Sequence, residues 1–319
     1  MASIPGGVAP FTDITLDLTG RRSGKVRVSY SLPGSRRLLV TTDRLSALDR
    51  VVTAVPYKGQ VLNQLAAWWF AQTALIVPNH VVELADPNVL IAVDVEPLPV
   101  EVVVRGAITG NTSTSLWRQY HEGRRTIYGH HLPDGLQRDT LLPAPLITPT
   151  TKAEAGAHDE PLSVPEVVER GLVAALLWEE VQAAALALFA HGQAVAAAAG
   201  LILADTKYEF GLDREGRLLL IDEMHTPDSS RFWVRDTYDE RLSRGEDPES
   251  LDKEPIRRAL SLTGYTGEGA PPDLGAAVVA ETTARYVTAY ERLTGEPFVP
   301  GNYPVAPRIE SALRTRGIL

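Results

Sequence analysis

A short segment near the middle of the chain carries charged side chains at a spacing that could support chemistry. Asp205, Lys207 and Glu209 occupy alternate positions and so share one face of a predicted strand, because side chains alternate across a strand. The apolar segment 218–221 follows and ends at Asp222. Carboxylates can hold Mg²⁺ and a lysine can meet phosphate oxygens, so the pattern is typical of a Mg–nucleotide site. A solvated strand face with cross-strand ion pairs is the alternative.

The next stretch combines hydroxyls, a carboxylate and an arginine. Asp228, Ser229, Ser230 and Arg231 follow a proline turn. An arginine beside serine hydroxyls is a good clamp for a phosphate or a carboxylate. The alternative is a turn whose hydroxyls bond their own backbone, and the residues alone favour it.

A third stretch, residues 105–115, contains an arginine, two glycines and several hydroxyls. Arg105 begins it, and Ser113 and Ser115 lie near its end. Glycines leave backbone N–H groups accessible, so the stretch could surround an anion. A polar loop without a ligand is the alternative.

A basic glycine-rich turn lies near the N-terminus. Three residues separate Gly20 from Gly24, and Val26 stands where a phosphate-binding P-loop needs Ser or Thr, so the match to that motif is poor. A turn that covers phosphates, with Lys25 and Arg27 on the following strand, fits better. The alternative is a basic hairpin turn.

Composition bounds the class of protein. The chain has 319 residues, a formal net charge of −9 and no cysteine. This length suggests one large domain or two intimate lobes, with a core that needs no disulfide or metal. The acidic balance argues against a nucleic-acid partner, and the lack of cysteine excludes disulfides, Cys–zinc sites and thiol nucleophiles. No HExxH or Gly-x-Ser-x-Gly motif occurs.

Targeting signals are not evident in the sequence. The first residues lack the basic and apolar regions of a signal peptide. The most apolar stretch, 173–203, is interrupted by Glu179, Glu180 and Gln182, so we expect amphipathic helices rather than a membrane span. We therefore expect a cytoplasmic protein without a membrane partner. No residue pattern indicates an oligomeric state.

The elements that must position these residues divide into a mainly β first part and a mixed second part. Strands followed by helices favour an α+β fold over a regular βαβ series, and we expect two lobes, 1–104 and 105–319. The expected strands are 25–31, 37–42, 89–95, 100–104, 201–210 and 217–221, with Pro97 and Pro99 separating the third from the fourth; the expected helices are 61–72, one or two within 163–199, 255–260 and 275–293; residues 106–165 are expected to be long ordered loops.

Together the motifs resemble the SAICAR synthetase family, the phosphoribosylaminoimidazole-succinocarboxamide synthases of purine biosynthesis. The matches run in order over nearly the whole chain, and the longest of them is highly specific. The matching motifs are Gly24-Lys-Val-Arg27, Thr42-Asp-Arg-Leu-Ser-Ala-Leu-Asp49, Lys58-Gly-Gln-Val-Leu-Asn63, Val102-Val-Val-Arg-Gly106, Thr148-Pro-Thr-Thr-Lys-Ala153, Ala204-Asp-Thr-Lys-Tyr-Glu-Phe-Gly211 and Ile221-Asp-Glu-Met-His-Thr-Pro-Asp-Ser-Ser-Arg-Phe-Trp233.

The resemblance implies two α+β lobes with ATP in a cleft between them, similar to kinases and ATP-grasp enzymes. It implies an amide-forming ligase that uses Mg–ATP to join the carboxylate of carboxyaminoimidazole ribotide (CAIR) to the amine of L-aspartate. The resemblance implies ATP binding by Gly24, Lys25, Arg27, Lys207, Glu209 and Asp222; Mg²⁺ binding by Glu209 and Asp222; substrate binding by Asp43, Arg44, Ser46, Arg105, Ser113, Ser115, Ser229, Ser230 and Arg231; and catalytic roles for Lys207, Asp205 and Asp228.

Three positions depart from the family pattern and bear on the substrate rather than on the type of reaction, and two alternatives of other classes are considered beside them. Val28, Leu48 and Ala107 stand where the family often has an acidic residue or an aromatic ring. The first alternative is a related amide ligase that acts on another azole carboxylate in a specialised nucleoside pathway. The second is a phosphotransferase on the same ATP-binding scaffold, and the third is a nucleotide-binding module without catalysis.

Overall fold

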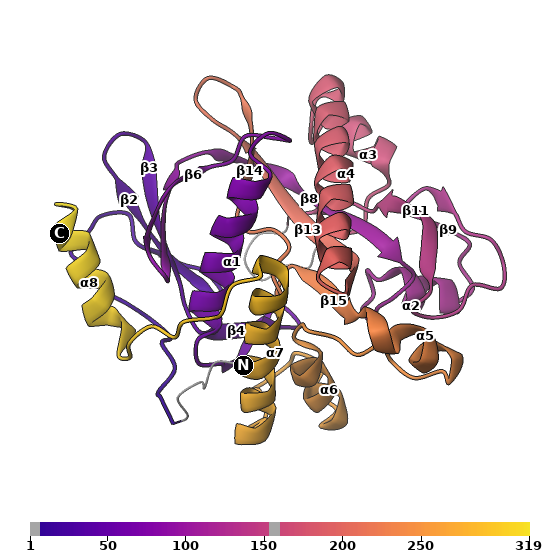
Figure 1. Cartoon of the computed structure of the whole chain (residues 1–319). Helices are drawn as coiled ribbons and strands as arrows, with labels where there is room; N and C mark the ends of the chain where they lie inside the picture. Colours follow the sequence, from indigo (N-terminus) through magenta and orange to yellow (C-terminus); the bar gives the residue numbers. More distant parts are fainter. Residues whose placement is uncertain (1–6, 153–159) are drawn as a thin grey trace.

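The computed structural model describes residues 7–152 and 160–319 and confirms an α+β fold. Two antiparallel sheets lie side by side, with helices over and beside them (Figure 1). The first sheet has the order β1-β2-β3-β7-β6, and the second has the order β11-β8-β13-β14 with β12 on β8 and β15 on β13.

The first sheet separates a helix from a pocket. Leu38 and Val40 of β3 face helix α8 and pack with its Ile309 and Leu313, whereas Leu39 faces the opposite side. The alternation of β3 thus gives the sheet one apolar face for α8 and one face that lines the pocket. The elements are β1 (Arg22–Ser23), β2 (Arg27–Leu32), β3 (Arg36–Thr41), β6 (Val81–Asp86), β7 (Val89–Val93) and α8 (Val305–Thr315), with the hairpin β4 (Arg44–Ala47) and β5 (Arg50–Ala54) beside them.

The second sheet buries one face under helices α1 and α4. Val102 and Val104 of β8 and Tyr208 of β13 pack with Trp69 of α1 and Phe189 of α4 in the largest apolar cluster. The intervening side chains of β8 and β13 therefore point to the opposite face. The elements are α1 (Lys58–Gln72), β8 (Glu96–Ala107), β11 (Leu141–Ile147), β12 (Thr150–Thr151), α4 (Ala175–Ala198), β13 (Leu201–Leu212), β14 (Leu218–Ile221) and β15 (Ser230–Val234).

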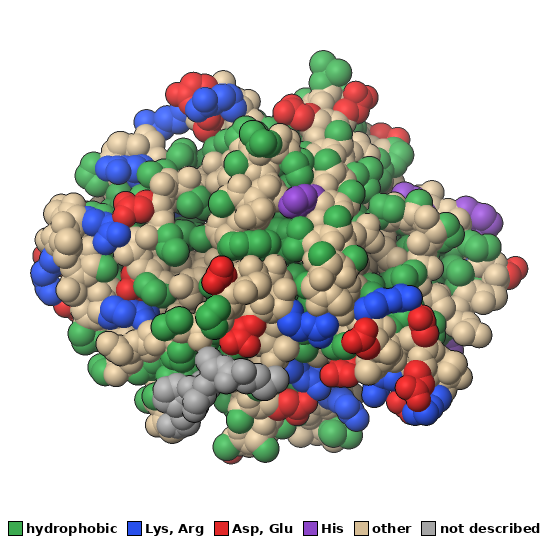
Figure 2. All heavy atoms as spheres, viewed as in Figure 1, with side chains coloured by type: hydrophobic (Ala, Val, Ile, Leu, Met, Phe, Trp, Pro, Cys, Tyr) green, Lys and Arg blue, Asp and Glu red, His purple; other side chains and the backbone are tan. Residues whose placement is uncertain are grey.

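The remaining helices and short strands surround the second sheet. Charged side chains of both signs gather over α5 at the lower right of Figure 2, where Arg235 pairs with Asp239 and Arg244 with Glu240. Ser163 begins α3 with a capping box, in which its hydroxyl and the Glu166 carboxylate bond each other's backbone N–H. These elements are α2 (Leu116–His121), β9 (Thr126–Ile127), β10 (His130–His131), α3 (Val164–Glu169), α5 (Arg235–Ser243), α6 (Glu254–Leu262) and α7 (Gly275–Thr294).

Several expected elements are confirmed, and others are wrong. The expected hairpin at 201–221 is present, and Gly200 ends α4 with φ 68°. The prediction that Pro97 and Pro99 separate two strands is wrong, because both prolines lie within β8. The carbonyl of Pro99 accepts a hydrogen bond from the Lys152 N–H. The stretch 106–165 also holds more regular structure than expected, including α2 and β11, and helices α5 and α8 lie outside the expected elements.

The chain passes between the two sheets more than once. The lobe boundary expected at residue 104 falls inside β8, all of which belongs to the second sheet. Helix α8, at the other end of the chain, packs on the first sheet. Each sheet is thus completed by segments distant in sequence.

Helix α4 lies in the stretch where we expect amphipathic core helices, and it also has the length and composition of a membrane span. Within the described ranges it is the one helix long and apolar enough to do so, with a mean hydropathy of 1.4. Leu188 and Phe189 lie in the core against β8 and β13, as in the core helix of a globular protein. Length and hydropathy alone are therefore weak evidence for a membrane span here.

Candidate functional site

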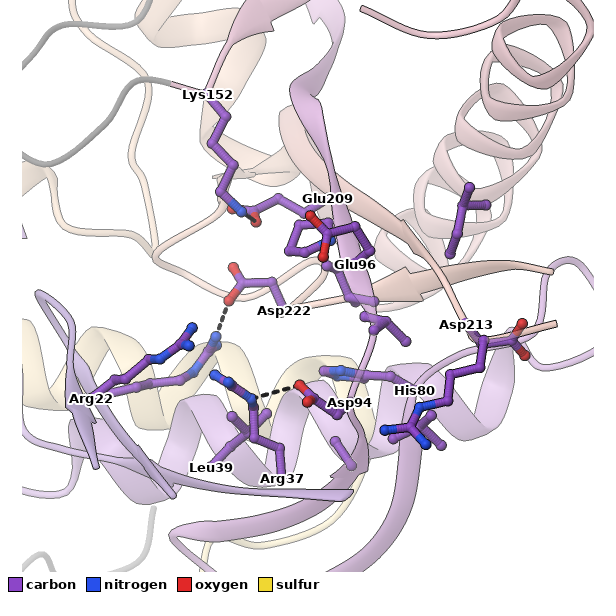
Figure 3. Close-up of a pocket in the computed structure, with 18 residues that line it drawn as sticks. Arg22, Arg37, Leu39, His80, Asp94, Glu96, Lys152, Glu209, Asp213 and Asp222 are labelled. Carbon is purple, nitrogen blue, oxygen red and sulfur yellow. Dashed lines mark hydrogen bonds and ion pairs between the residues drawn. The ribbon is translucent and has the colours of Figure 1, made fainter. Parts of the chain in front are cut away.

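A pocket of about 590 Å³ lies between the two sheets, and both contribute to its walls (Figure 3). Arg27 and Leu39 come from the first sheet, and Glu209 and Ile221 come from the second. Pockets of this size between structural units are common sites for small molecules. The four lining positions come from segments almost 200 residues apart in sequence.

Asp222 enters this pocket from the end of β14. Its backbone has φ 66°, in the left-handed region, which turns the chain sharply where the strand ends. Its carboxylate pairs with the Arg27 guanidinium, which also lies 3.6 Å from a Glu223 oxygen. Burial would lower the pKa of Arg27, but the charges of Asp222 and Glu223 outweigh it and raise this pKa above its ordinary value. Arg27 therefore stays charged at any working pH.

Glu209 lies deeper in the pocket and accepts from two lysines. Its two carboxylate oxygens lie 2.5 Å from Lys152 Nζ and 2.7 Å from Lys207 Nζ. Burial would raise the pKa of Glu209, but Lys207 and Lys152 outweigh it and lower this pKa to about 2. Lys207 also donates to Glu101 Oε1 at 2.7 Å, and Glu101 lies directly opposite Glu209 in the β8–β13 register. The predicted shared face of Asp205, Lys207 and Glu209 is confirmed, and the cross-strand ion pair of the alternative interpretation is present as well.

The ammonium of Lys207 keeps its charge for a related reason. Burial would lower its pKa, but the carboxylates of Glu209 and Glu101 outweigh burial and raise this pKa well above the ordinary value. Lys207 is therefore a fixed positive charge at neutral pH. It can neutralise an anion but cannot accept a proton.

A second charged cluster lies at the other end of the same strand face. Asp205 pairs with Arg231, and Arg105 Nη1 lies 3.7 Å from an Asp205 oxygen. The β-sheet register explains this, because Arg105 and Arg231 lie opposite Asp205 on its two neighbouring strands. Arg105 also donates to the Thr148 hydroxyl at 2.8 Å and to the Thr114 carbonyl at 3.0 Å.

The loop after Arg105 approaches this cluster closely. Gly110 has φ +92°, and a Cβ added there would lie 2.6 Å from Ser115 Cβ and 3.3 Å from Arg231 Nη2. A residue with a side chain would therefore push the loop away from the arginine. Ser115 is buried and donates to the Thr112 carbonyl at 2.6 Å, whereas Ser113 is exposed.

Asp228 is held by two buried partners. One carboxylate oxygen lies 2.8 Å from Lys58 Nζ, and the other accepts from the Tyr286 hydroxyl at 2.5 Å. Burial would raise the pKa of Asp228, but Lys58 and Lys253 outweigh it and lower this pKa to about 2. The side chain joins α1, the loop before β15 and α7.

The serines after Asp228 form local contacts. Ser229 Oγ accepts from the Thr226 N–H at 3.1 Å, and Ser230 Oγ lies 2.7 Å from Thr206 Oγ1. The alternative interpretation of this stretch, a turn whose hydroxyls bond their own backbone, describes the contacts of Ser229. Arg231 alone of the stretch reaches the cluster around Asp205.

Asp43, Arg44 and Ser46 lie apart from the pocket lining. Asp43 is buried and accepts from the Phe11 N–H at 2.8 Å, the Gly59 N–H at 2.9 Å and the Tyr303 hydroxyl at 2.7 Å. Burial raises its pKa. Arg44 supports the strand beneath the glycine turn by donating to the carbonyl of Arg27 at 3.2 Å, and the Ser46 carbonyl accepts from Lys253 at 3.3 Å.

The glycine turn holds its lysine at the protein surface. Gly24 donates its N–H to the Arg27 carbonyl at 2.9 Å, which closes the turn. Lys25 is about half exposed and pairs with Asp49 at 2.8 Å, outside the lining of the pocket. Of this basic turn and strand, Arg22 and Arg27 line the pocket.

Several described residues outside the predicted set belong to these clusters, among them Lys58, Glu101, Lys152, Glu223 and Tyr286. Alternation in β8 could have revealed Glu101, because Glu101 and Arg105 interrupt an otherwise apolar run at positions on one face. Lys58 and Lys152 lie within motifs that carry the family resemblance. No local signal marks Tyr286, whose partner is 58 residues away.

Comparison with known proteins identifies the family of the chain. A family model described as SAICAR synthetase matches residues 21–271. A relative from Agrobacterium fabrum is 50% identical over 286 residues, which cover 89% of this chain and 90% of that one. The phosphoribosylaminoimidazole-succinocarboxamide synthase of Legionella pneumophila is 48% identical, covering 92% of this chain and 93% of that one. The SAICAR synthase of Saccharomyces cerevisiae, solved in complex with SAICAR, aligns with a TM-score of 0.78 and 32% identity over 91% of this chain and 100% of that chain. The chain belongs to the SAICAR synthetase family.

Proposed function

We propose that the chain uses ATP to join the carboxylate of CAIR to the amine of L-aspartate, releasing SAICAR, ADP and phosphate. SAICAR synthase activity in purine biosynthesis follows from membership of the family. The identity of the azole carboxylate and the roles of individual residues are proposals. We also propose a cytoplasmic location.

One observation carries the proposal: two anion-binding clusters lie on a single strand face. Glu209 lies at the nucleotide-sized pocket, and Asp205 lies between Arg105 and Arg231. The strand is regular between them, so four residues at 3.3–3.4 Å each separate the clusters by roughly 13 Å. Lys207 lies midway, with its positive charge facing the same side. The arrangement suits transfer between a nucleotide at one end and an anionic substrate at the other.

We assign the pocket to ATP and Mg²⁺. Mg²⁺ in phosphoryl-transfer sites is held by one or two carboxylates together with substrate phosphates, so Glu209 and Asp222 fit it as a pair. When bound, the cation would neutralise charge on the phosphates. Arg27 is a partly buried cation that lines this space, and Lys207 contacts it through Glu209. Gly24 and Lys25 remain proposed parts of the ATP site at its outer rim.

We assign Arg105 and Arg231 to the phosphate or carboxylate of the ribotide, with the 110–115 loop beside them. Arginine binds such groups through two parallel hydrogen bonds, which fixes orientation as well as charge. Asp205 orients both guanidinium groups, so we give it a positioning role rather than a role at the reacting atoms. Asp228 and Asp43 also become positioning residues, because protein donors already occupy their oxygens.

In the proposed reaction the protein positions the reactants and neutralises the charge that develops on them. A carboxylate is a poor acyl donor because its oxide is a poor leaving group. Transfer of the terminal phosphoryl group to CAIR would give an acyl phosphate, and attack by the aspartate amine would release phosphate. Lys207, lying between the clusters, would neutralise charge that develops on the transferred group. Oxygen-18 in the CAIR carboxylate should therefore appear in the released phosphate.

The deciding experiment measures ADP release and product mass with ATP, CAIR and L-aspartate, omitting each in turn. ADP and SAICAR formed only in the complete mixture support the proposal. ADP formed with neither CAIR nor an amine, when a hydroxyl acceptor is supplied, would instead favour a phosphotransferase. Binding of ATP with a silent complete mixture would redirect the search to another azole carboxylate or amine.

A further inference from the structure

We propose that Lys152 competes with a divalent cation for Glu209 and, when displaced, binds the phosphates of the nucleotide. Lys152 is thus a nucleotide-binding residue whose ammonium moves between two anions, the Glu209 carboxylate and a phosphate. The inference rests on the proposed function for the identity of the nucleotide. Its first half, the competition at Glu209, concerns this chain alone.

The carboxylate of Glu209 has no free oxygen in the observed arrangement. Lys152 Nζ lies 2.5 Å from Oε2, and Lys207 Nζ lies 2.7 Å from Oε1. The Glu209 side chain is 11% exposed, so its surroundings leave little room for a third partner. A metal ion that binds Glu209 directly therefore competes with the two ammonium groups for the same carboxylate.

Of the two ammonium groups on Glu209, that of Lys152 is the more easily displaced. Lys207 is held by a second carboxylate, Glu101, at 2.7 Å. Among residues 7–152 and 160–319, Lys152 has Glu209 as its single ion-pair partner. The Lys152 side chain is also 37% exposed, so its ammonium can move without leaving water for an apolar interior.

The displaced ammonium would remain at the pocket. Lys152 lines it, and Figure 3 shows the side chain entering from above towards Glu209, with Asp222 below. The Lys152 N–H donates to the Pro99 carbonyl at 3.1 Å, which fixes the backbone while the long side chain turns. Nucleotide phosphates in this pocket would offer the nearest new negative charge, and a lysine ammonium binds phosphate as a point charge.

This competition predicts that removing the charge of Lys152 strengthens the binding of a divalent cation and weakens the binding of ADP. Two unit charges about 4 Å apart in water interact by about 1 kcal/mol, which corresponds to about fivefold in a binding constant. Lys152→Gln should therefore bind Mn²⁺, used as a probe for Mg²⁺, at least about fivefold more tightly without nucleotide. The same variant should bind ADP about fivefold more weakly. A purely structural role for Lys152 would weaken both.

The test uses the full chain and titration calorimetry, with Mn²⁺ alone and with ADP at saturating Mn²⁺. Arg244→Gln is the matched control, because it removes one positive charge from an exposed ion pair with Glu240 on α5, and neither residue lines the pocket. It should change neither constant. Lys152→Arg keeps the charge and should stay within about twofold of wild type for Mn²⁺. In a Glu209→Gln background, Lys152→Gln should lose its effect on Mn²⁺.

The possible results separate the two proposals. Unchanged or weaker Mn²⁺ binding by Lys152→Gln, with Lys152→Arg folded and equal to wild type, overturns the competition. Tighter Mn²⁺ binding with unchanged ADP binding overturns the phosphate half. If the wild-type chain binds Mn²⁺ but no ADP, the proposed function fails together with the phosphate half, whereas the Mn²⁺ series still decides the competition at Glu209.

Discussion

The buried ion pair between Lys58 and Asp228 yields a prediction whose size can be worked from the structure. The Lys58 side chain is fully buried, the Asp228 side chain is 6% exposed, and the charged atoms lie 2.8 Å apart. Lys58→Met leaves a buried carboxylate without its main counter-charge, which costs about 3–5 kcal/mol. Asp228 keeps the Tyr286 hydroxyl as a donor, so we expect about 3 kcal/mol, the lower end of this range.

The expected loss can be read from heat or urea unfolding. For a chain of this length an unfolding entropy of about 2.1 cal/mol/K per residue converts 3 kcal/mol into a fall in Tm of about 4–5 °C. The double variant Lys58→Met/Asp228→Asn should recover at least half of the loss, because it removes the unpaired charge as well. A single-variant loss below about 1 kcal/mol, or a double variant no more stable than Lys58→Met, would refute this reasoning.

The same pair has a pH signature. The folded pKa of Asp228, about 2, lies below its ordinary value of 3.8. Its contribution to stability is therefore present above about pH 4 and is lost as the pH falls towards 2. In Lys58→Met the buried carboxylate loses the charge that lowers its pKa, so it destabilises the fold most when ionised. The stability difference between the two proteins should be larger at pH 7 than at pH 4.

Three further predictions concern the site. Arg231→Lys should raise KM for CAIR by about 10- to 100-fold, because lysine cannot reproduce two parallel hydrogen bonds, and should leave KM for ATP within about twofold. Equal effects on the two KM values in steady-state kinetics would contradict the assignment of Arg231 to the ribotide. Gly110→Ala should also raise KM for CAIR, since its Cβ would meet Ser115 at 2.6 Å; an unchanged KM would show that the loop does not approach the ligand. Glu209→Gln should lower kcat by at least about 100-fold while calorimetry in EDTA still detects ADP binding, and a variant that turns over normally would remove Glu209 from the proposed metal site.

Sequence reasoning could reach the side chains that share one local element. Asp205, Lys207 and Glu209 were expected on one strand face because a period of two requires it, and the hairpin signal fixed where the partner strand lies. The partners themselves are set by the register between distant strands. Glu101 meets Lys207, and Arg105 meets Asp205, because β8 lies beside β13, which no local pattern encodes.

The buried anchors were harder to foresee for the same reason. Asp228 resembles a functional acid in sequence, and its position between Lys58 and Tyr286 depends on how α1 and α7 pack around one loop. Asp43 is similar, because its three donors come from residues 11, 59 and 303. An acidic residue in a motif can therefore support the architecture of a site without touching the ligand.

The packing of α8 on the first sheet has a consequence for how the protein is made. The apolar face formed by Leu38, Val40 and Ile91 is covered by Ile309 and Leu313 of α8, which are synthesised much later. At about 5–20 residues per second, a ribosome needs roughly 11–44 s to synthesise the chain from the end of β7 to α8. During that interval the nascent first sheet presents an apolar surface to the cell. Chaperone capture at this stage, and aggregation of chains that stop before α8, are the expected results.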